Sequence, residues 1–484
     1  MPELGSTLQS LPPTAPSQFL PFGRCVEKGV EYIDVSFKEE PLGLGSKHGF
    51  GHYDAQFGEV MGPANGSTEY RIERKLGWGL YSSVWLAREL QKDRFVALKI
   101  LTTHATNLHL KAVFIEIDAL ALLMGHLNII DPLRCFTIPS KQGHGDLEEE
   151  KHVVIATALY SGSLKDIIKR SPDPFPPLPF VKRALLHVLR GLAHMHSHNL
   201  VHTAAEFALE DLKSDNILVD NGPLTNADID ALLAVDPPRR YPPEASESQT
   251  VEVAVSQPLP VPTIEEAMTR TFCISDMGVV RPKDSLKAGM HLSPSELQAP
   301  EVILGAPLDE KVDIWLFGLL LHETLTGYKL FTRPTREFAA DSPTDSEELE
   351  PDSPTEELEP DIWKHEPDDP IWEHEPDALT TAISFQLWQM CALLTNVDVF
   401  PPYLRGGIHA DKYLDSDGGI LEPYLPKQQH GTLRRTLDGQ RPGLDAAEGA
   451  AIAAILERCL KLDARERPRA AELLEDPWWW NVQP

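Results

Sequence analysis

Three side chains that suit phosphoryl transfer lie close together in the segment DLKSDNILV, namely Asp211, Lys213 and Asn216. Transfer of a phosphoryl group to a hydroxyl needs a carboxylate that orients the hydroxyl and accepts its proton. It also needs a Lys that balances the charge of the γ-phosphate and an amide oxygen that holds Mg²⁺. Farther along, Asp276 in ISDMG offers Mg²⁺ a carboxylate at the end of an expected strand. Together these residue types predict a phosphoryl-transfer site.

A glycine-rich stretch, LGWGLYSSV, precedes this site in the chain at residues 76–84. On a strand–turn–strand, Gly77 and Gly79 would let the backbone close over phosphates, where a Cβ would clash. Val84 would then press on an adenine ring. Glycine-rich hairpins are common, so a purely structural hairpin is the alternative interpretation.

Lys99 and Glu116 suit the two ends of a buried ion pair. Lys99 ends the strand pattern Val96-Ala97-Leu98-Lys99 with apolar residues on both sides, from where it could reach the α- and β-phosphates. Glu116 interrupts an apolar run on the helix expected over 109–125, as a partner of Lys99 would. The alternatives are a solvated Lys at a strand edge and a surface Glu. A second pair is predicted between Glu301 and Arg467.

The composition limits the classes of partner. The chain has 484 residues and a net charge of −29, which argues against direct binding of nucleic acid or an anionic membrane and favours basic partners. Solubility alone is the other explanation of this acidity. Five scattered cysteines without a CxxC pair indicate neither a disulfide framework nor a zinc site, and favour a reducing compartment. No secretory signal or membrane span is expected.

Periodicity predicts the elements that position these residues. Strands are expected over 71–90, 95–101 and 152–160, and a long helix over 179–199. Residues 1–65 have the composition of an extended lead-in. Two further segments break the pattern: the Pro-rich stretch 221–270 reads as a linker, and 341–377 is a degenerate acidic repeat with 16 Asp and Glu against one Lys.

All these motifs in this order resemble the eukaryotic protein kinase family, and within it the SR-protein kinases of the fungal type. The family pattern LGWG-x-[FY]-S-[ST]-VWLA stands here as LGWGLYSSVWLA, with Ser82 at the third glycine position. His202-Thr203 replaces the usual His-Arg, as in that subfamily, and the Pro-rich insert between Asn216 and Asp276 sits where these kinases carry a spacer. The resemblance covers roughly residues 50–480.

The resemblance implies an α+β, bilobal kinase fold with a small N-lobe over 66–160 and a larger helical C-lobe over 161–484. It implies a monomeric enzyme that uses Mg²⁺ and ATP to phosphorylate Ser or Thr in Arg/Ser-rich proteins of mRNA processing, in the cytoplasm and nucleus. Asp211 would be the base with Lys213 assisting it, Glu116 would pair with Lys99, and Asn216 and Asp276 would bind the metal. Thr157 would be the gatekeeper before a hinge at 158–160. The nucleotide site would be lined by Leu76, Gly77, Trp78, Gly79, Val84, Ala97, Lys99, Thr157 and Leu159.

The chain departs from the family pattern in three places. Met277 stands where the family has Phe or Leu, and Ala158 stands where the hinge often has Glu. More seriously, seven residues, AAEFALE at 204–210, separate His202-Thr203 from Asp211, which directly follow one another in the family. Either the insertion impairs or restricts the enzyme, or a wrongly assigned exon boundary added it. A pseudokinase scaffold that binds ATP and basic partners is therefore the alternative function.

Overall fold

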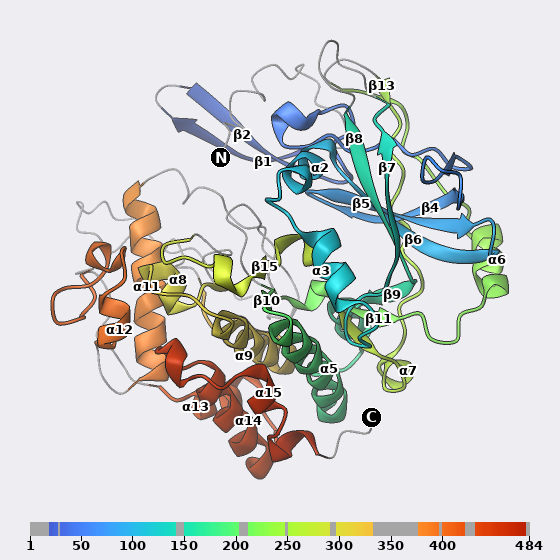
Figure 1. Cartoon of the computed structure of the whole chain (residues 1–484). Helices are drawn as coiled ribbons and strands as arrows, with labels where there is room; N and C mark the ends of the chain where they lie inside the picture. Colours follow the sequence, from blue (N-terminus) through green and yellow to red (C-terminus); the bar gives the residue numbers. More distant parts are fainter. Residues whose placement is uncertain are drawn as a thin grey trace, which may run out of the picture. The chain divides into compact units, whose positions relative to one another are not determined.

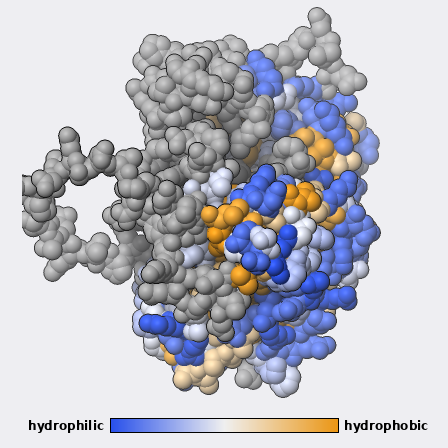
Figure 2. Space-filling model, turned by 90° about the vertical axis from the view of Figure 1, so that its left-hand side faces the viewer, coloured by the Kyte–Doolittle hydropathy of each residue, from blue (hydrophilic) through white to orange (hydrophobic). Residues whose placement is uncertain are grey.

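The computed structural model describes residues 19–27, 30–141, 150–202, 212–246, 250–290, 297–332, 376–395, 399–421 and 431–480. The chain divides into two units, Met1–Ile167 with Asp215–Val280, and Ile168–Ser214 with Arg281–Pro484. In the part of the chain that is described, none of the helices is both long and apolar enough to cross a bilayer. Among the residues that are coloured in Figure 2, most are hydrophilic, and the apolar ones form a few small groups.

A six-stranded antiparallel sheet is the centre of the first unit (Figure 1). Its order is β3-β4-β5-β6-β8-β7, and β4 and β5 are joined by the two-residue turn Leu80–Tyr81. Alternate residues of each strand face opposite sides, because side chains on a strand have a period of two. The strands predicted over 71–90 and 95–101 are confirmed, and the strand predicted over 152–160 is β8, which ends at Thr157. Their bounds are β3 (Val60–Met61), β4 (Tyr70–Gly79), β5 (Ser82–Glu89), β6 (Arg94–Leu101), β7 (Pro132–Pro139) and β8 (Lys151–Thr157).

The segment before the sheet is folded, and not merely extended as its composition suggested. It contains the hairpin β1 (Phe19–Glu27) and β2 (Val30–Phe37) and the short 3₁₀ helix η1 (Ser46–His48). Tyr53, Ala55 and Met61 are buried in one apolar cluster with Trp85 and Leu98 of the sheet. The reason is that aromatic and apolar side chains are interspersed among the glycines, and they cover one face of the sheet.

The helix predicted over 109–125 is wrong as a single element. The structure has α2 (Thr103–Leu110) and α3 (Glu116–Leu123), separated by a break in which Ala112 has a φ of 54°. Val113 and Ile115 are β-branched, which lowers helix propensity. Phe114 leaves the helical path and packs edge-on against Tyr81, with 5.5 Å between ring centroids.

The Pro-rich segment 221–270, which reads as a linker in the sequence, contains helices and strands in its described residues. With its neighbours it forms the stretch Asp215–Val280, which groups with the first unit. It contains α6, which begins at a capping box formed by Thr225 and Asp228. Ile229 of α6 is buried against Leu86 and Phe95 of the sheet. The elements of this part of the unit are β9 (Tyr160–Ser163), η2 (Ser214–Asn216), β11 (Ile217–Asp220), α6 (Asn226–Val235), β12 (Glu244–Ala245), β13 (Thr250–Val251), α7 (Ile264–Ala267), β14 (Phe272–Ile274) and η3 (Met277–Val279).

The second unit is helical and is built around α9, where almost every side chain is buried. The long helix predicted over 179–199 is confirmed as α5. Residues 341–375 of the acidic repeat lie outside the described residues. Helix α4 (Leu164–Arg170) lies where the two units meet in the chain; the second unit itself contains α5 (Leu178–Ser197), β10 (Leu200–Val201), β15 (Arg281–Pro282), η4 (Lys283–Ser285), α8 (Pro300–Leu304), α9 (Lys311–Thr326), α11 (Pro376–Leu394), α12 (Pro402–Arg405), η7 (Ala410–Lys412), α13 (Leu433–Gln440), α14 (Ala446–Cys459), η8 (Ala464–Glu466), α15 (Ala470–Leu473) and η9 (Pro477–Trp479).

Candidate active site

The glycine-rich stretch forms the hairpin of β4 and β5, as its sequence predicted. Gly77 pairs with Val84 and Gly79 pairs with Ser82. A Cβ built on Gly77 would meet no other atom within 4 Å, so packing inside the protein does not require glycine there. Close approach of a phosphate group to this backbone would require glycine, whereas packing inside the protein does not.

Lys99 lies opposite Val84 on the neighbouring strand β6 and reaches two carboxylates. Its Nζ atom is 2.7 Å from Oε1 of Glu116 at the start of α3 and 3.1 Å from Oδ1 of Asp276. Burial by itself would lower the pKa of Lys99, but the carboxylates of Asp276 and Glu116 outweigh it and raise that pKa above its usual range. Lys99 is therefore a cation at neutral pH, as a ligand of phosphate must be.

Asn216 and Asp276 are brought together by the pairing of β11 with β14. The backbone N–H and the hydroxyl of Ser275 both donate to the backbone carbonyl of Asn216, each at 2.9 Å. Asp276 follows with a φ of 57°, a left-handed conformation that is uncommon outside glycine and frequent at functional sites. An amide and a carboxylate on adjacent strand ends suit a hard divalent cation, so these two residues could hold Mg²⁺.

Apolar side chains predicted to contact adenine gather on the same face of the sheet as Lys99. Ala97 and Leu159 belong to one buried cluster, and Leu76 and Val84 pack against it, half-buried. The spacer helix α6 contributes to the same cluster, which the sequence did not predict. Thr157 lies opposite Ala97, and its hydroxyl donates to the carbonyl of Ala158 at 3.0 Å.

The candidate catalytic loop is described only in part. Asp211, together with 204–210, lies outside the described residues, and Lys213 belongs to the second unit. Just before the loop, the backbone N–H of buried His202 donates to Oδ2 of Asp313 at 2.9 Å. His196 approaches the same oxygen with Nε2 at 2.8 Å. Sequence reasoning missed His196, although its place six residues before His202 on the end of α5 is a usable signal.

The predicted pair of Glu301 and Arg467 is confirmed. The guanidinium makes two parallel contacts with the carboxylate, of 2.6 Å and 2.8 Å, and both side chains are at most 1% exposed. It also donates to the backbone carbonyls of Lys461 and Lys311. Bidentate geometry in a dry site is the strongest form of this contact.

Trp78, the remaining predicted residue of the nucleotide site, lies on the opposite face of the sheet. It pairs with Ser83, and its ring packs edge-on against His52, with 6.0 Å between centroids. Its backbone can still line the hairpin, but its side chain belongs to the other side. The catalytic, nucleotide-binding and metal-binding roles of the site residues stay predictions.

Comparison with known proteins agrees with this geometry. Residues 70–245 match the family described as the protein kinase domain. The chain is 26% identical over 310 residues to the serine/threonine-protein kinase SRPK of Physarum polycephalum, covering 58% of this chain and 65% of that protein. It is 26% identical over 282 residues to the kinase AFC1 of Arabidopsis thaliana, covering 58% and 51% respectively. With SRSF protein kinase 3 of Homo sapiens it is 29% identical over 178 residues, covering 35% and 28%. The chain thus spans less than two thirds of the length of each of these relatives. Over residues 70–245 the chain is thus similar to a protein kinase domain, its β-rich first unit and helical second unit agree with the α+β kinase fold, and the chain as a whole is similar to SRPK-like kinases.

Proposed function

We propose that the chain is a protein serine/threonine kinase that uses ATP and Mg²⁺ to phosphorylate Ser or Thr in basic, Arg/Ser-rich proteins. The observation that carries this proposal is the contact of Lys99 with both Glu116 and Asp276. These contacts hold a cation on β6 opposite Val84 of the glycine-rich hairpin, and Asp276 directly follows Ser275, which donates to the carbonyl of Asn216. The printed names of the SRPK and SRSF relatives support the same substrate class.

In the proposed reaction, ATP supplies the γ-phosphoryl group. Lys99 would bind the α- and β-phosphates, and Asn216 and Asp276 would hold Mg²⁺. Asp211 would orient the substrate hydroxyl and take its proton as the new oxygen–phosphorus bond forms and the β–γ bridging bond breaks. Lys213 would balance charge on the transferred group.

The net charge of −29 supports the choice of basic substrates, because opposite charge steers encounter and suppresses wrong partners. We extend the proposal to a monomeric enzyme that acts in the cytoplasm and nucleus on proteins of mRNA processing, without direct contacts to nucleic acid or membranes. The acidic repeat at 341–377 would contribute to substrate choice.

The test is a kinase assay of the full chain with an Arg-Ser repeat peptide and an acidic peptide of equal length. Lys99→Ala and Asp211→Ala should each lower the rate with the Arg-Ser peptide at least about a hundredfold, since each removes a charge aimed at the reacting groups. Lys92→Ala is the matched control, because Lys92 is an exposed Lys of the β5–β6 turn that pairs only with Glu89. Its rate should equal that of the unchanged chain.

The salt dependence and the choice between the two peptides test the proposed substrate class separately from the kinase activity. The preference for the Arg-Ser peptide should shrink at high salt, because exposed charges are screened over about 8 to 10 Å at physiological ionic strength. Removal of 341–377 should weaken the preference if that segment takes part. Equal rates with the acidic peptide would overturn the substrate class but leave the kinase activity. Binding of ATP with no turnover of either peptide would favour the scaffold alternative, for which the insertion at 204–210 is the specific observation.

A further inference from the structure

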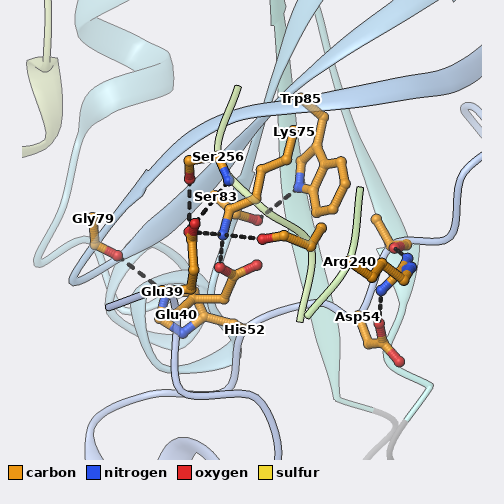
Figure 3. A network of polar contacts seen from close by, with 12 residues as sticks. Glu39, Glu40, His52, Asp54, Lys75, Gly79, Ser83, Trp85, Arg240 and Ser256 are labelled. Atoms are coloured by element: carbon orange, nitrogen blue, oxygen red, sulfur yellow. Dashed lines mark hydrogen bonds and ion pairs between the residues drawn. The ribbon is translucent and has the colours of Figure 1, made fainter. Parts of the chain in front are cut away.

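His52 holds the tip of the glycine-rich hairpin, although no motif in the sequence singles it out. Its Nε2 atom lies 3.0 Å from the backbone carbonyl oxygen of Gly79, and its side chain is only 4% exposed (Figure 3). A carbonyl oxygen can only accept, so Nε2 carries the hydrogen and donates it. Burial lowers the pKa of His52 to about 4, and the ring is therefore neutral at neutral pH, with its single proton in this bond.

The bond fixes the orientation of the peptide group between Gly79 and Leu80. In a planar trans peptide the C=O of Gly79 and the N–H of Leu80 point in opposite directions. His52 lies on the face of the sheet that carries Trp78, and the next residue, Tyr53, is buried in the cluster of that same face. The amide of Leu80 is thereby directed away from that face, at the turn of the hairpin.

Directly before His52, the segment that carries it is anchored to the start of α2. The carbonyl of Gly51 accepts from the backbone N–H of Thr103 at 2.9 Å, and that of Phe50 accepts from the N–H of His104 at 3.2 Å. Gly51 has a φ of 93°, and a Cβ there would lie 2.0 Å from the Thr103 hydroxyl oxygen, so this close approach needs glycine.

Farther upstream, the segment is anchored to the base of the hairpin. Lys75, the residue directly before Leu76, is fully buried and lies between the carboxylates of Glu39 and Glu40, with Nζ 2.6 Å from Glu39 (Figure 3). Ser256 of the spacer donates its N–H and its hydroxyl to Glu39, each at 2.7 Å. One anchor binds Lys75 within β4 of the hairpin, and the other binds the start of α2, which follows β6 of the same sheet. Together they tie the segment that carries His52 to the sheet that contains the hairpin.

We propose that His52 is a positioning residue of the nucleotide site, which holds the Gly79 carbonyl so that the Leu80 amide stays directed at the nucleotide phosphates. The proposal rests on the nucleotide site of the proposed function. It assigns the N-terminal segment a role in binding phosphate without any contact to the nucleotide.

The test compares three variants of the full chain by calorimetric titration with Mg-ATP and, separately, with adenosine, which lacks phosphates. His52→Phe keeps the ring but removes the donor, and His52→Gln keeps a donor of similar reach. His152→Phe is the matched control: His152 is also buried, its Nδ1 lies 2.8 Å from the carbonyl of Leu101, and its ring packs edge-on against Tyr53 at 5.1 Å. It disturbs the packing beside His52 but leaves the contact with Gly79 in place.

His52→Phe should bind Mg-ATP about fivefold more weakly, the effect of one net hydrogen bond, and should bind adenosine as the unchanged chain does. His52→Gln should restore binding of Mg-ATP to within about twofold. His152→Phe should leave both affinities unchanged even if it unfolds more easily. Amide hydrogen exchange of residues 76–82 in the absence of nucleotide should be faster in His52→Phe than in His152→Phe, which tests the anchor even if a variant binds poorly.

Two results would overturn the proposal. One is an unchanged affinity of His52→Phe for Mg-ATP, and the other is an equal loss for adenosine and Mg-ATP, which would mark a general structural role. If the unchanged chain binds neither ligand while its fold is intact, the nucleotide site itself is refuted, and that failure is distinct from the other two.

Discussion

Replacement of Glu301 by Gln is the sharpest test of how the second unit is held together. The carboxylate and the guanidinium of Arg467 are at most 1% exposed, so neither charge regains water unless the structure opens. Loss of one partner of such a pair costs about 3 to 5 kcal/mol, because the other charge stays buried and uncompensated. Arg467 keeps the carbonyls of Lys461 and Lys311 and lies 5.0 Å from the ring centroid of Trp315, which favours the lower end, about 3 kcal/mol.

The assay is urea unfolding of the full chain followed by tryptophan fluorescence, with Trp315 as a reporter next to the pair. The matched control is Asp438→Asn, which removes the same kind of charge from the exposed pair of Arg434 and Asp438 on α13. Its transition should coincide with that of the unchanged chain, because both groups remain in water. If Glu301→Gln unfolds at the same urea concentration as the control, the pair is not buried as described and the reasoning from desolvation is refuted.

Three further predictions concern other parts of the chain. Lys75→Met should destabilise the first unit by about 3 kcal/mol, since it leaves two carboxylates buried without a cation, and Glu40→Gln in the same background should recover part of this loss in urea unfolding. Burial lowers the pKa of His322 to about 4, so the unfolded chain binds more protons between pH 4 and 6.5. The contribution of His322 to the free energy of unfolding should therefore be complete above pH 6.5 and fall by up to about 3 kcal/mol towards pH 4. If a His322→Gln variant loses as much stability between pH 6.5 and pH 4 as the unchanged chain, another group is responsible. Deletion of residues 204–210 should raise kcat at least about tenfold with little change in the affinity for ATP, because small misplacements beside the reacting phosphate are costly; an unchanged kcat would mean that the insertion is accommodated.

The sequence predicted the parts of the site that depend on local pattern. The alternation of apolar residues placed Lys99 and Val84 on strands, and their pairing across β5 and β6 follows from the short hairpin between them. The interruption of an apolar run identified Glu116 as a partner for Lys99, and the structure joins them at 2.7 Å. Each of these predictions rests on the pattern of the residues directly around one position, which strand and helix periods make readable.

The parts of the fold that the sequence did not predict depend on contacts between residues far apart in the chain, which no local pattern encodes. Glu39 meets Ser256 across 217 positions of the chain, and in a Gly- and Pro-rich stretch its carboxylate looks like a solvated surface group. The spacer looked like a linker because its prolines outweigh the ten residues of α6 in any composition window. The break between α2 and α3 escaped because the apolar spacing of the helix continues across it, while the burial of Phe114 against Tyr81 decides the backbone.

The way the spacer is closed explains how a long insertion can stand between two metal-binding candidates. At its base the N–H of Asp220 donates to the carbonyl of Thr271 at 3.0 Å, and the N–H of Thr271 donates to the Asp220 carboxylate at 2.7 Å. The strands that carry Asn216 and Asp276 are thus joined before the chain departs, and the cost of a longer loop grows only slowly with its length. The insertion at 204–210 has a comparable anchor on its N-terminal side, where Leu200 and Val201 pair with β15. What distinguishes it in the sequence is that it directly precedes Asp211, the proposed base. For that reason the long spacer is compatible with catalysis, whereas the seven residues are expected to decide how fast it runs.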